Sequence, residues 1–198
     1  PTTRSPASDS TARNTAASWG WVARLLHWVM AGLILFMLGL GLYMTHFEPD
    51  LLRQFSLIQL HKSWGFVVFC LALVRLGWRL NGRSPAEPAG LASWQRAAAR
   101  GTHAALYVVM LALPLSGWIT ASASPTQDLL GIRNMVFGLF AMPDPWVPGK
   151  AGIETAAGEI HTAAAILLAA LLVLHVGAVL WHRFALRDDV LLRMTIGR

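Results

Sequence analysis

Long apolar runs, separated by short polar stretches, dominate the chain. Four of these runs are long enough to cross a hydrocarbon core of about 30 Å, which takes about 20 helical residues. They span residues 22–45, 57–79, 103–123 and 158–182. The pattern predicts an all-α integral membrane protein, a four-helix bundle in which residues 21–198 form one domain. Residues 1–20 are rich in Ser, Thr and Ala without an apolar period, which predicts a disordered tail.

The composition agrees with a membrane location. Hydrophobic residues make up 55% of the chain, charged residues only 13%, and the mean hydropathy is +0.50, unlike an average soluble domain. Cys70 is the only cysteine and lies inside the second apolar run. A single cysteine excludes a disulfide framework, a CxxCH haem attachment and a four-cysteine iron–sulfur cluster within this chain.

Basic residues are unevenly distributed along the chain. If the chain begins on the cytoplasmic side, only four of its 16 Lys and Arg residues fall on the opposite side: Arg53, Lys62, Arg133 and Lys150. Cytoplasmic loops retain Lys and Arg, so both termini are predicted to be cytoplasmic. The same asymmetry accounts for the pI near 10.7. The charge therefore predicts lipid as a partner and no nucleic acid.

Two connections contain segments of their own. WQRAAARG, ahead of the third run, is predicted to be a short interfacial helix. In the connection 124–157, LLGIRNMVFGLFAM is amphipathic enough to lie on the outer membrane surface. PDPWVPGKAG, which follows it, is typical of turns.

A histidine stands at each end of HTAAAILLAALLVLH, residues 161–175. Fourteen helical residues turn through about 1400°, within roughly 40° of whole turns, and rise about 21 Å. Both rings therefore leave one face of the helix at two depths. His61 lies near the outer start of the second run, at the same depth as His161. His27 lies near the inner start of the first run, at the same depth as His175. The sequence predicts an outer pair and an inner pair.

Two facing imidazoles in an apolar bundle suit haem, which takes one axial nitrogen on each side of its iron. Zinc normally takes three or four protein ligands. A proton-coupled transporter usually has an intramembrane carboxylate, and the interiors of the four runs contain no Asp or Glu. Haem is therefore favoured, with a metal site, a proton pathway and hydrogen-bonded packing as the alternatives.

Two further residues could assist a flat macrocycle. Arg75 follows His61 by fourteen residues, which puts it at the depth of the inner pair. There its guanidinium could bind a haem propionate, or its side chain could reach the inner interface. Gly65, one turn after His61, would let a ring approach the backbone closely.

Two inner histidines could handle protons. His182 follows His175 by seven residues, about 20° off the same face and roughly 10 Å deeper toward the cytoplasm. Since imidazole titrates near neutrality, His182 could pass protons to a quinone. His103, at the start of the third run, could do the same or replace an inner ligand.

Several stretches carry a family likeness. They are LLHW around His27, LHKSWG around His61, VRLGWRL around Arg75, LYVVMLALPLSGW in the third run, and EIHTAAAILLAALLVLHVGAVLWHRF with the trailing DDVLLRM. Together they resemble the bacterial cytochrome b561 family, four-helix membrane di-haem proteins. The resemblance implies that residues 21–198 are a di-haem cytochrome b domain. It places two haem b groups, one between His27 and His175 and one between His61 and His161.

The resemblance also implies an activity. The best-defined small members of this family are superoxide oxidases of the bacterial inner membrane, in which superoxide gives up an electron outside and ubiquinone is reduced near the cytoplasm. It implies that His182 contributes to the quinone site. Lysines of the family's second connection are missing here, so Arg83 and Arg96 would take their place. Lys62, beside His61, is the candidate to attract an anionic donor such as superoxide.

Two other functions stay open at this point. An electron-carrier subunit would take electrons from a periplasmic dehydrogenase or cytochrome, docked on the apolar outer connection, and pass them to quinone. A membrane transporter or metal-handling protein would use the histidines as a pathway. The presence of b-type haem separates this last class from the other two.

Overall fold

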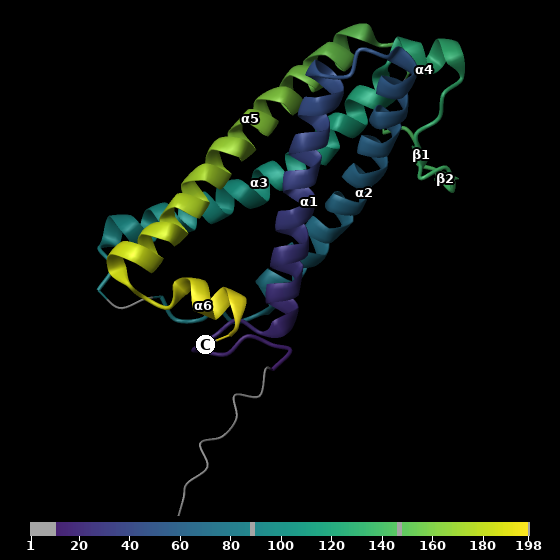
Figure 1. Ribbon diagram of the computed structural model, residues 1–198. Helices are drawn as coiled ribbons and strands as arrows, with labels where there is room; N and C mark the ends of the chain where they lie inside the picture. The colour runs from purple at the N-terminus through teal and green to yellow at the C-terminus, as the bar shows by residue number, and fades with distance from the viewer. Residues whose placement is uncertain (1–10, 88–89, 146–147, 198) are drawn as a thin grey trace, which may run out of the picture.

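Four long helices build the protein, whose computed structural model describes residues 11–87, 90–145 and 148–197. These helices are α1 (Trp21–His46), α2 (Leu51–Asn81), α3 (Ser93–Ala123) and α5 (Ala151–Trp181) (Figure 1). Within the described residues, all four are long and apolar enough to cross a membrane. The mostly helical, four-span architecture predicted from the apolar runs is confirmed.

Smaller elements occupy the two ends of the bundle. They are α4 (Pro125–Leu130), the antiparallel strands β1 (Met135–Val136) and β2 (Phe140–Ala141), the π-helical turn η1 (His182–Leu186) and α6 (Val190–Thr195). LLGIRNMVFGLFAM thus contains only the last two residues of α4 and continues as the hairpin of β1 and β2. Phe137 and Gly138 take positive φ angles in the hairpin turn, a conformation that glycine adopts readily.

Three helices start six or more residues before their apolar runs, among them α5, which begins at Ala151 and not at residue 158. α2 begins at Leu51 because Asp50 caps it: the Asp50 carboxylate accepts a hydrogen bond of 2.8 Å from Arg53 N. α3 begins at Ser93, so WQRAAARG forms the first turns of this helix and not a separate interfacial helix. No proline interrupts this alanine-rich stretch, and the helix continues through it into the span.

The segment ahead of α1 lies against the connection between α2 and α3. Asn14 Nδ2 donates to Arg83 O at 2.8 Å, and Ala86 N donates to Ala16 O at 2.9 Å. A Cβ on Gly20 would lie 2.4 Å from Ala12 O, so this close approach needs glycine. Residues 11–20 therefore make more fixed contacts than their composition predicted, and residues 1–10 lie outside the described part of the chain.

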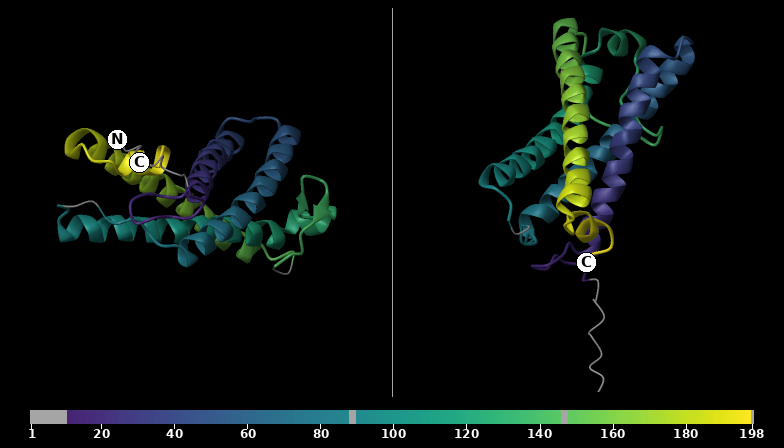
Figure 2. Two further views of the ribbon diagram at one scale, coloured as in Figure 1. Left: turned by 90° about the horizontal axis from the view of Figure 1, so that it is seen from below. Right: turned by 60° about the vertical axis from the view of Figure 1, so that its left-hand side comes forward.

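The helices pack as neighbours in the order α1, α2, α3, α5. The pairs α1–α2 and α3–α5 diverge toward the end where α6 lies (Figures 1 and 2). There α6 crosses from the end of α5 to the start of α1 (Figure 1). Trp28 Nε1 donates to Met194 O at 3.1 Å and Arg24 Nη1 to Thr195 O at 3.0 Å, which fixes α6 to α1.

The hydrophobic core is small and is shared by the four long helices. It contains Met30, Ile34, Val68, Ala72, Val109, Met110, Leu168 and Leu171. On α5 its two leucines lie between His161 and His175, so apolar packing separates the two histidine levels. Many large apolar side chains point outward, for example Ile166 and Val173, which are 68% and 72% exposed. A lipid-facing surface explains this exposure.

Candidate functional site

The outer histidine pair joins α2 to α5. The ring centres of His61 and His161 lie 6.2 Å apart. The two helices do not pack as neighbours within the described residues, so their imidazoles bridge the space between them.

His161 is held in a defined orientation by α3. Its Nδ1 lies 2.9 Å from Leu113 O and 3.3 Å from Ser116 Oγ. A carbonyl can only accept, so Nδ1 carries the ring proton and Nε2 keeps its lone pair for a ligand. A Cβ on Gly117 would lie 3.0 Å from His161 Cε1 and 3.1 Å from Nδ1. Gly117 therefore makes room for the ring.

His61 lies against α1. A Cβ on Gly41 would be 3.5 Å from His61 Cε1, so another glycine lets this ring approach a neighbouring backbone. His61 Nδ1 is buried and has no hydrogen-bond partner among the described residues. A buried imidazole nitrogen without a partner is unfavourable, so packing alone does not explain this histidine.

The inner pair joins α1 to α5. The ring centres of His27 and His175 lie 6.2 Å apart, the same separation as in the outer pair. His103 of α3 has its ring centre 5.4 Å from that of His175. The fourteen-residue spacing on α5 thus meets a histidine of another helix at each level.

Arg75 lies beside the inner pair. Its Nη2 donates to His27 Nδ1 at 2.8 Å, its Nε to the Tyr107 hydroxyl at 3.3 Å and its Nη1 to Leu26 O at 3.5 Å. Among the described residues, no carboxylate forms an ion pair with Arg75. A half-buried guanidinium without a counter-ion is costly, which makes this position a candidate anion site.

The two pairs fit the axial positions of a haem. A metal ion held at about 2.0 Å from one nitrogen of each imidazole sets the two ring centres roughly 6 Å apart. Both pairs have this separation. In the described part of the chain, no three His, Cys, Asp or Glu side chains are arranged to hold one ion. Zinc, which needs at least three protein ligands, fits less well than a porphyrin, which brings its own equatorial nitrogens.

Sequence comparison identifies the family. The family described as prokaryotic cytochrome b561 matches residues 18–197. Cytochrome b561 homolog 2 of Escherichia coli (strain K12) is 30% identical over 181 residues, which cover 91% of this chain and 93% of the relative. Cytochrome b561 homolog 1 of the same organism is 30% identical over 135 residues, 68% of this chain and 72% of the relative.

The chain belongs to the prokaryotic cytochrome b561 family. It is therefore a multi-pass bacterial membrane protein that transfers electrons across the membrane by means of b-type haem. The resemblance seen in the histidine motifs is confirmed.

The other residues predicted for the outer end of this cytochrome have different surroundings. Lys62 is half-buried, and the negative charge of the Asp144 carboxylate attracts its ammonium group. Asp144 also accepts hydrogen bonds from Gln127 and from the buried Asn134. A Cβ on Gly65 would meet only Met37 Cε, at 3.9 Å, so Gly65 does not lie against a histidine ring as Gly41 and Gly117 do.

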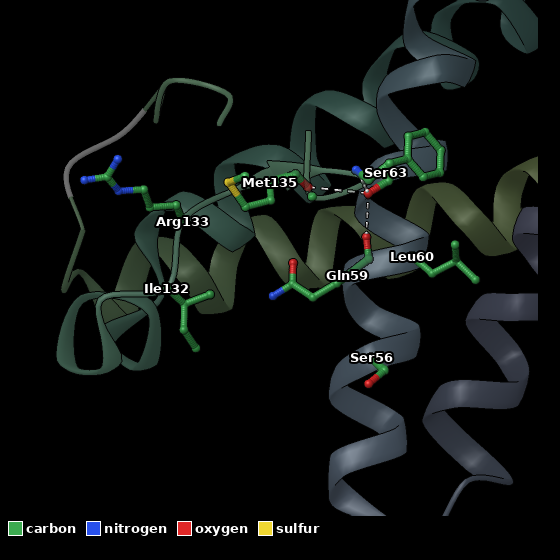
Figure 3. Close-up of a pocket in the computed structure, with 9 residues that line it drawn as sticks. Ser56, Gln59, Leu60, Ser63, Ile132, Arg133 and Met135 are labelled. Carbon is green, nitrogen blue, oxygen red and sulfur yellow. Dashed lines mark hydrogen bonds between the residues drawn. The ribbon is translucent and has the colours of Figure 1, made fainter. Parts of the chain in front are cut away.

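A pocket of about 440 Å³ opens at this end between α2 and the segment that carries β1 (Figure 3). Ser63, on its wall, accepts a hydrogen bond from Phe137 N and donates one to Gln59 O, both at 2.9 Å. Ser63 is 3% exposed and thus anchors the hairpin to α2. The neighbouring apolar side chains are exposed, with Leu139 at 80% and Phe140 at 53%.

At the inner end, the predicted proton carrier has a carboxylate partner. His182 Nδ1 lies 2.5 Å from Asp188 Oδ2. Arg96, expected to replace a family lysine, has its Nε 3.9 Å from the Glu87 carboxylate. Arg83 offers its backbone carbonyl to Asn14.

Proposed function

We propose that this cytochrome holds one haem b between His61 and His161 and a second between His27 and His175. The observation that carries the proposal is the ring separation of 6.2 Å found at both levels of α5. When bound, each haem would supply an iron that gains and loses one electron, held by the two histidines of its pair. Donor and acceptor must therefore exchange electrons at the edges of the sites.

The chain's own groups orient these ligands. The Leu113 carbonyl keeps the proton of His161 on Nδ1, which leaves Nε2 to coordinate. At the inner level the Arg75 guanidinium can only donate, so His27 Nδ1 accepts from it. Coordination through Nε2 would move the ring proton to Nδ1 and free Arg75 to bind a propionate carboxylate. This exchange would give the guanidinium its missing counter-ion.

The outer donor is proposed to be superoxide. With both termini in the cytoplasm, as the basic residues predict, the His61–His161 level faces the outside. Lys62 would raise the local concentration of an anion beside His61, although Asp144 offsets part of its charge. Each superoxide loses one electron and becomes dioxygen. Two of them supply the electrons that convert one quinone and two protons into a quinol.

The acceptor is proposed to be ubiquinone at the end that carries α6, within the inner membrane. His182, the first residue of η1, follows the inner ligand His175 by seven residues, about 10 Å along the helix axis. Its imidazole is the group that would exchange protons with the quinone.

A specific observation also supports the electron-carrier alternative. The hairpin exposes Leu139 and Phe140 beside the pocket on α2, and contiguous exposed apolar groups often mark a docking surface. A periplasmic dehydrogenase or cytochrome bound there would deliver electrons at the His61–His161 level.

A superoxide pulse separates these candidates. Purified holoprotein is mixed anaerobically with superoxide while haem absorbance is followed on the millisecond scale. We expect rapid haem reduction, abolished by superoxide dismutase and slowed in Lys62→Gln. Absence of rapid reduction in protein that dithionite fully reduces would exclude superoxide oxidation and leave the carrier function. Absence of any haem spectrum would exclude both in favour of a transporter or metal-handling protein.

A further inference from the structure

α5 ends in a turn that brings an aspartate back onto a histidine. The π-helical turn His182–Leu186 leads into Arg187, whose φ of 53° is left-handed. The chain reverses there, and Asp188 Oδ2 comes to 2.5 Å from His182 Nδ1. Residues six apart on an α-helix point in different directions, so only this turn makes the contact possible. π-helical turns are rare and are often found at functional sites.

Both oxygens of the Asp188 carboxylate are engaged. Oδ2 faces His182 Nδ1, and Oδ1 accepts a hydrogen bond of 3.1 Å from Val190 N at the start of α6. The side chains of His182 and Asp188 are 20% and 24% exposed. Since Nδ1 is occupied, Nε2 is the ring nitrogen left to exchange a proton with a ligand, and no group in the described ranges bonds to it.

The His182–Asp188 pair lies two helical turns beyond the level of His27 and His175. His182 is two turns beyond His175 on nearly the same face of α5. α6 follows directly and is fixed to α1 through Trp28 and Arg24. The pair therefore stands where the diverging ends of α1 and α5 are spanned by α6 (Figure 1).

We propose that Asp188 is a positioning residue that holds His182 as proton donor to a membrane quinone at this end of the bundle. The inference rests on the proposed quinone reduction. The quinone receives two electrons from the outer donor and two protons through His182. For each proton an Nε2–H bond breaks and a quinone O–H bond forms, after which Nε2 takes a proton from cytoplasmic water. The Nδ1 proton stays on the ring throughout, donated in a hydrogen bond to the Asp188 carboxylate.

Other charged groups lie on the elements around His182. They are Arg183, Arg187, Asp189 and Arg193. Within the described residues, Asp188 is the one charged group that pairs with His182. Arg193 instead donates to Ala86 O at 2.8 Å. Asp189 thus provides a matched control, a neighbouring carboxylate without a bond to the ring.

The test compares Asp188→Asn with Asp189→Asn in holoprotein reconstituted into vesicles that contain ubiquinone. Val190 N and His182 Nδ1 face different oxygens of Asp188, and asparagine replaces one of these oxygens by an NH2 group, which cannot accept a hydrogen bond. Haem reduction by superoxide and haem reoxidation by quinone are measured separately between pH 5.5 and 8.5. Haem content and thermal unfolding report whether each variant folds. The single variant His182→Ala and the double variant with both His182→Ala and Asp188→Asn complete a double-mutant cycle.

We expect Asp188→Asn to slow reoxidation by quinone about 10-fold to 100-fold, the range found when a metal-binding histidine loses its orienting partner. The pH dependence of reoxidation should change in Asp188→Asn, while haem reduction by superoxide stays at the wild-type rate. The double variant should reoxidise no more slowly than His182→Ala alone. Two results would overturn the role of Asp188 without touching the proposed quinone reduction. One is a wild-type rate of haem reoxidation and a wild-type pH profile in Asp188→Asn. The other is a reoxidation rate in the double variant that falls by the product of the two single losses. A wild-type protein whose reduced haems do not pass electrons to quinone would overturn the proposed acceptor and this inference together.

Discussion

Gly117→Ala tests whether the outer histidine is a positioned ligand. The added methyl group would lie 3.0 Å from His161 Cε1 and 3.1 Å from Nδ1, closer than ordinary van der Waals contact. The ring cannot simply move away, because Nδ1 is bonded to Leu113 O. Either this hydrogen bond lengthens or α3 and α5 separate locally.

Two opposing terms set the magnitude. Replacing glycine by alanine inside a helix gains roughly 1 kcal/mol, whereas an extra methyl group in a tight contact costs about 1–3 kcal/mol. The net effect of Gly117→Ala is therefore neutral to about 2 kcal/mol destabilising. Gly101, on the same helix, would place its Cβ with nothing within 4 Å. Gly101→Ala should instead stabilise by up to about 1 kcal/mol.

The assay has two readouts. Thermal unfolding in detergent should rank Gly101→Ala above wild type and Gly117→Ala at or below it. Reduced-minus-oxidised spectra should show that Gly117→Ala loses or alters one haem while Gly101→Ala retains the wild-type spectrum. If Gly117→Ala is as stable as Gly101→Ala and its spectrum is unchanged, the close approach to His161 has no role at the site.

Three further predictions concern other contacts. His161→Ala should remove the outer haem and leave the inner one, halving haem per chain; loss of both spectra together would show that the pairing is wrong. Arg75→Leu should weaken retention of the inner haem more than Arg75→Lys, measured as haem content after detergent washing, and equal retention in both would exclude a propionate contact. Ser63→Ala should leave Phe137 N unpaired at a cost of about 1–3 kcal/mol, so limited proteolysis should cut the hairpin faster, whereas unchanged cleavage would show that Ser63 does not anchor it.

The long helices and the meeting of histidines followed from the sequence because both depend on regular helical geometry. The spacing of His161 and His175 is fixed by the rise and twist of one uninterrupted helix. Depth in the membrane then selected the partners on α1 and α2. Helix starts were less predictable: α2 starts where Asp50 caps it, in a region whose hydropathy is too low to mark a span.

Apart from the histidine pairs, contacts between elements could not be read from the sequence. Gly117 and Gly41 receive histidine rings, yet glycine is common in membrane helices and nothing in the sequence separates them from Gly65. The contact between His182 and Asp188 spans six residues, which helical periodicity does not bring together. It depends on the π-helical turn and the left-handed Arg187, for which the sequence carries no turn signal.

The proposed electron transfer requires each of the two imidazole pairs to hold a haem iron. Quantifying haem b per chain in purified protein, together with low-temperature electron paramagnetic resonance of the oxidised form, tests it most directly. We expect two haems b per chain, both low-spin with two nitrogen axial ligands. A single haem, a high-spin signal with an open axial position, or colourless protein would contradict it.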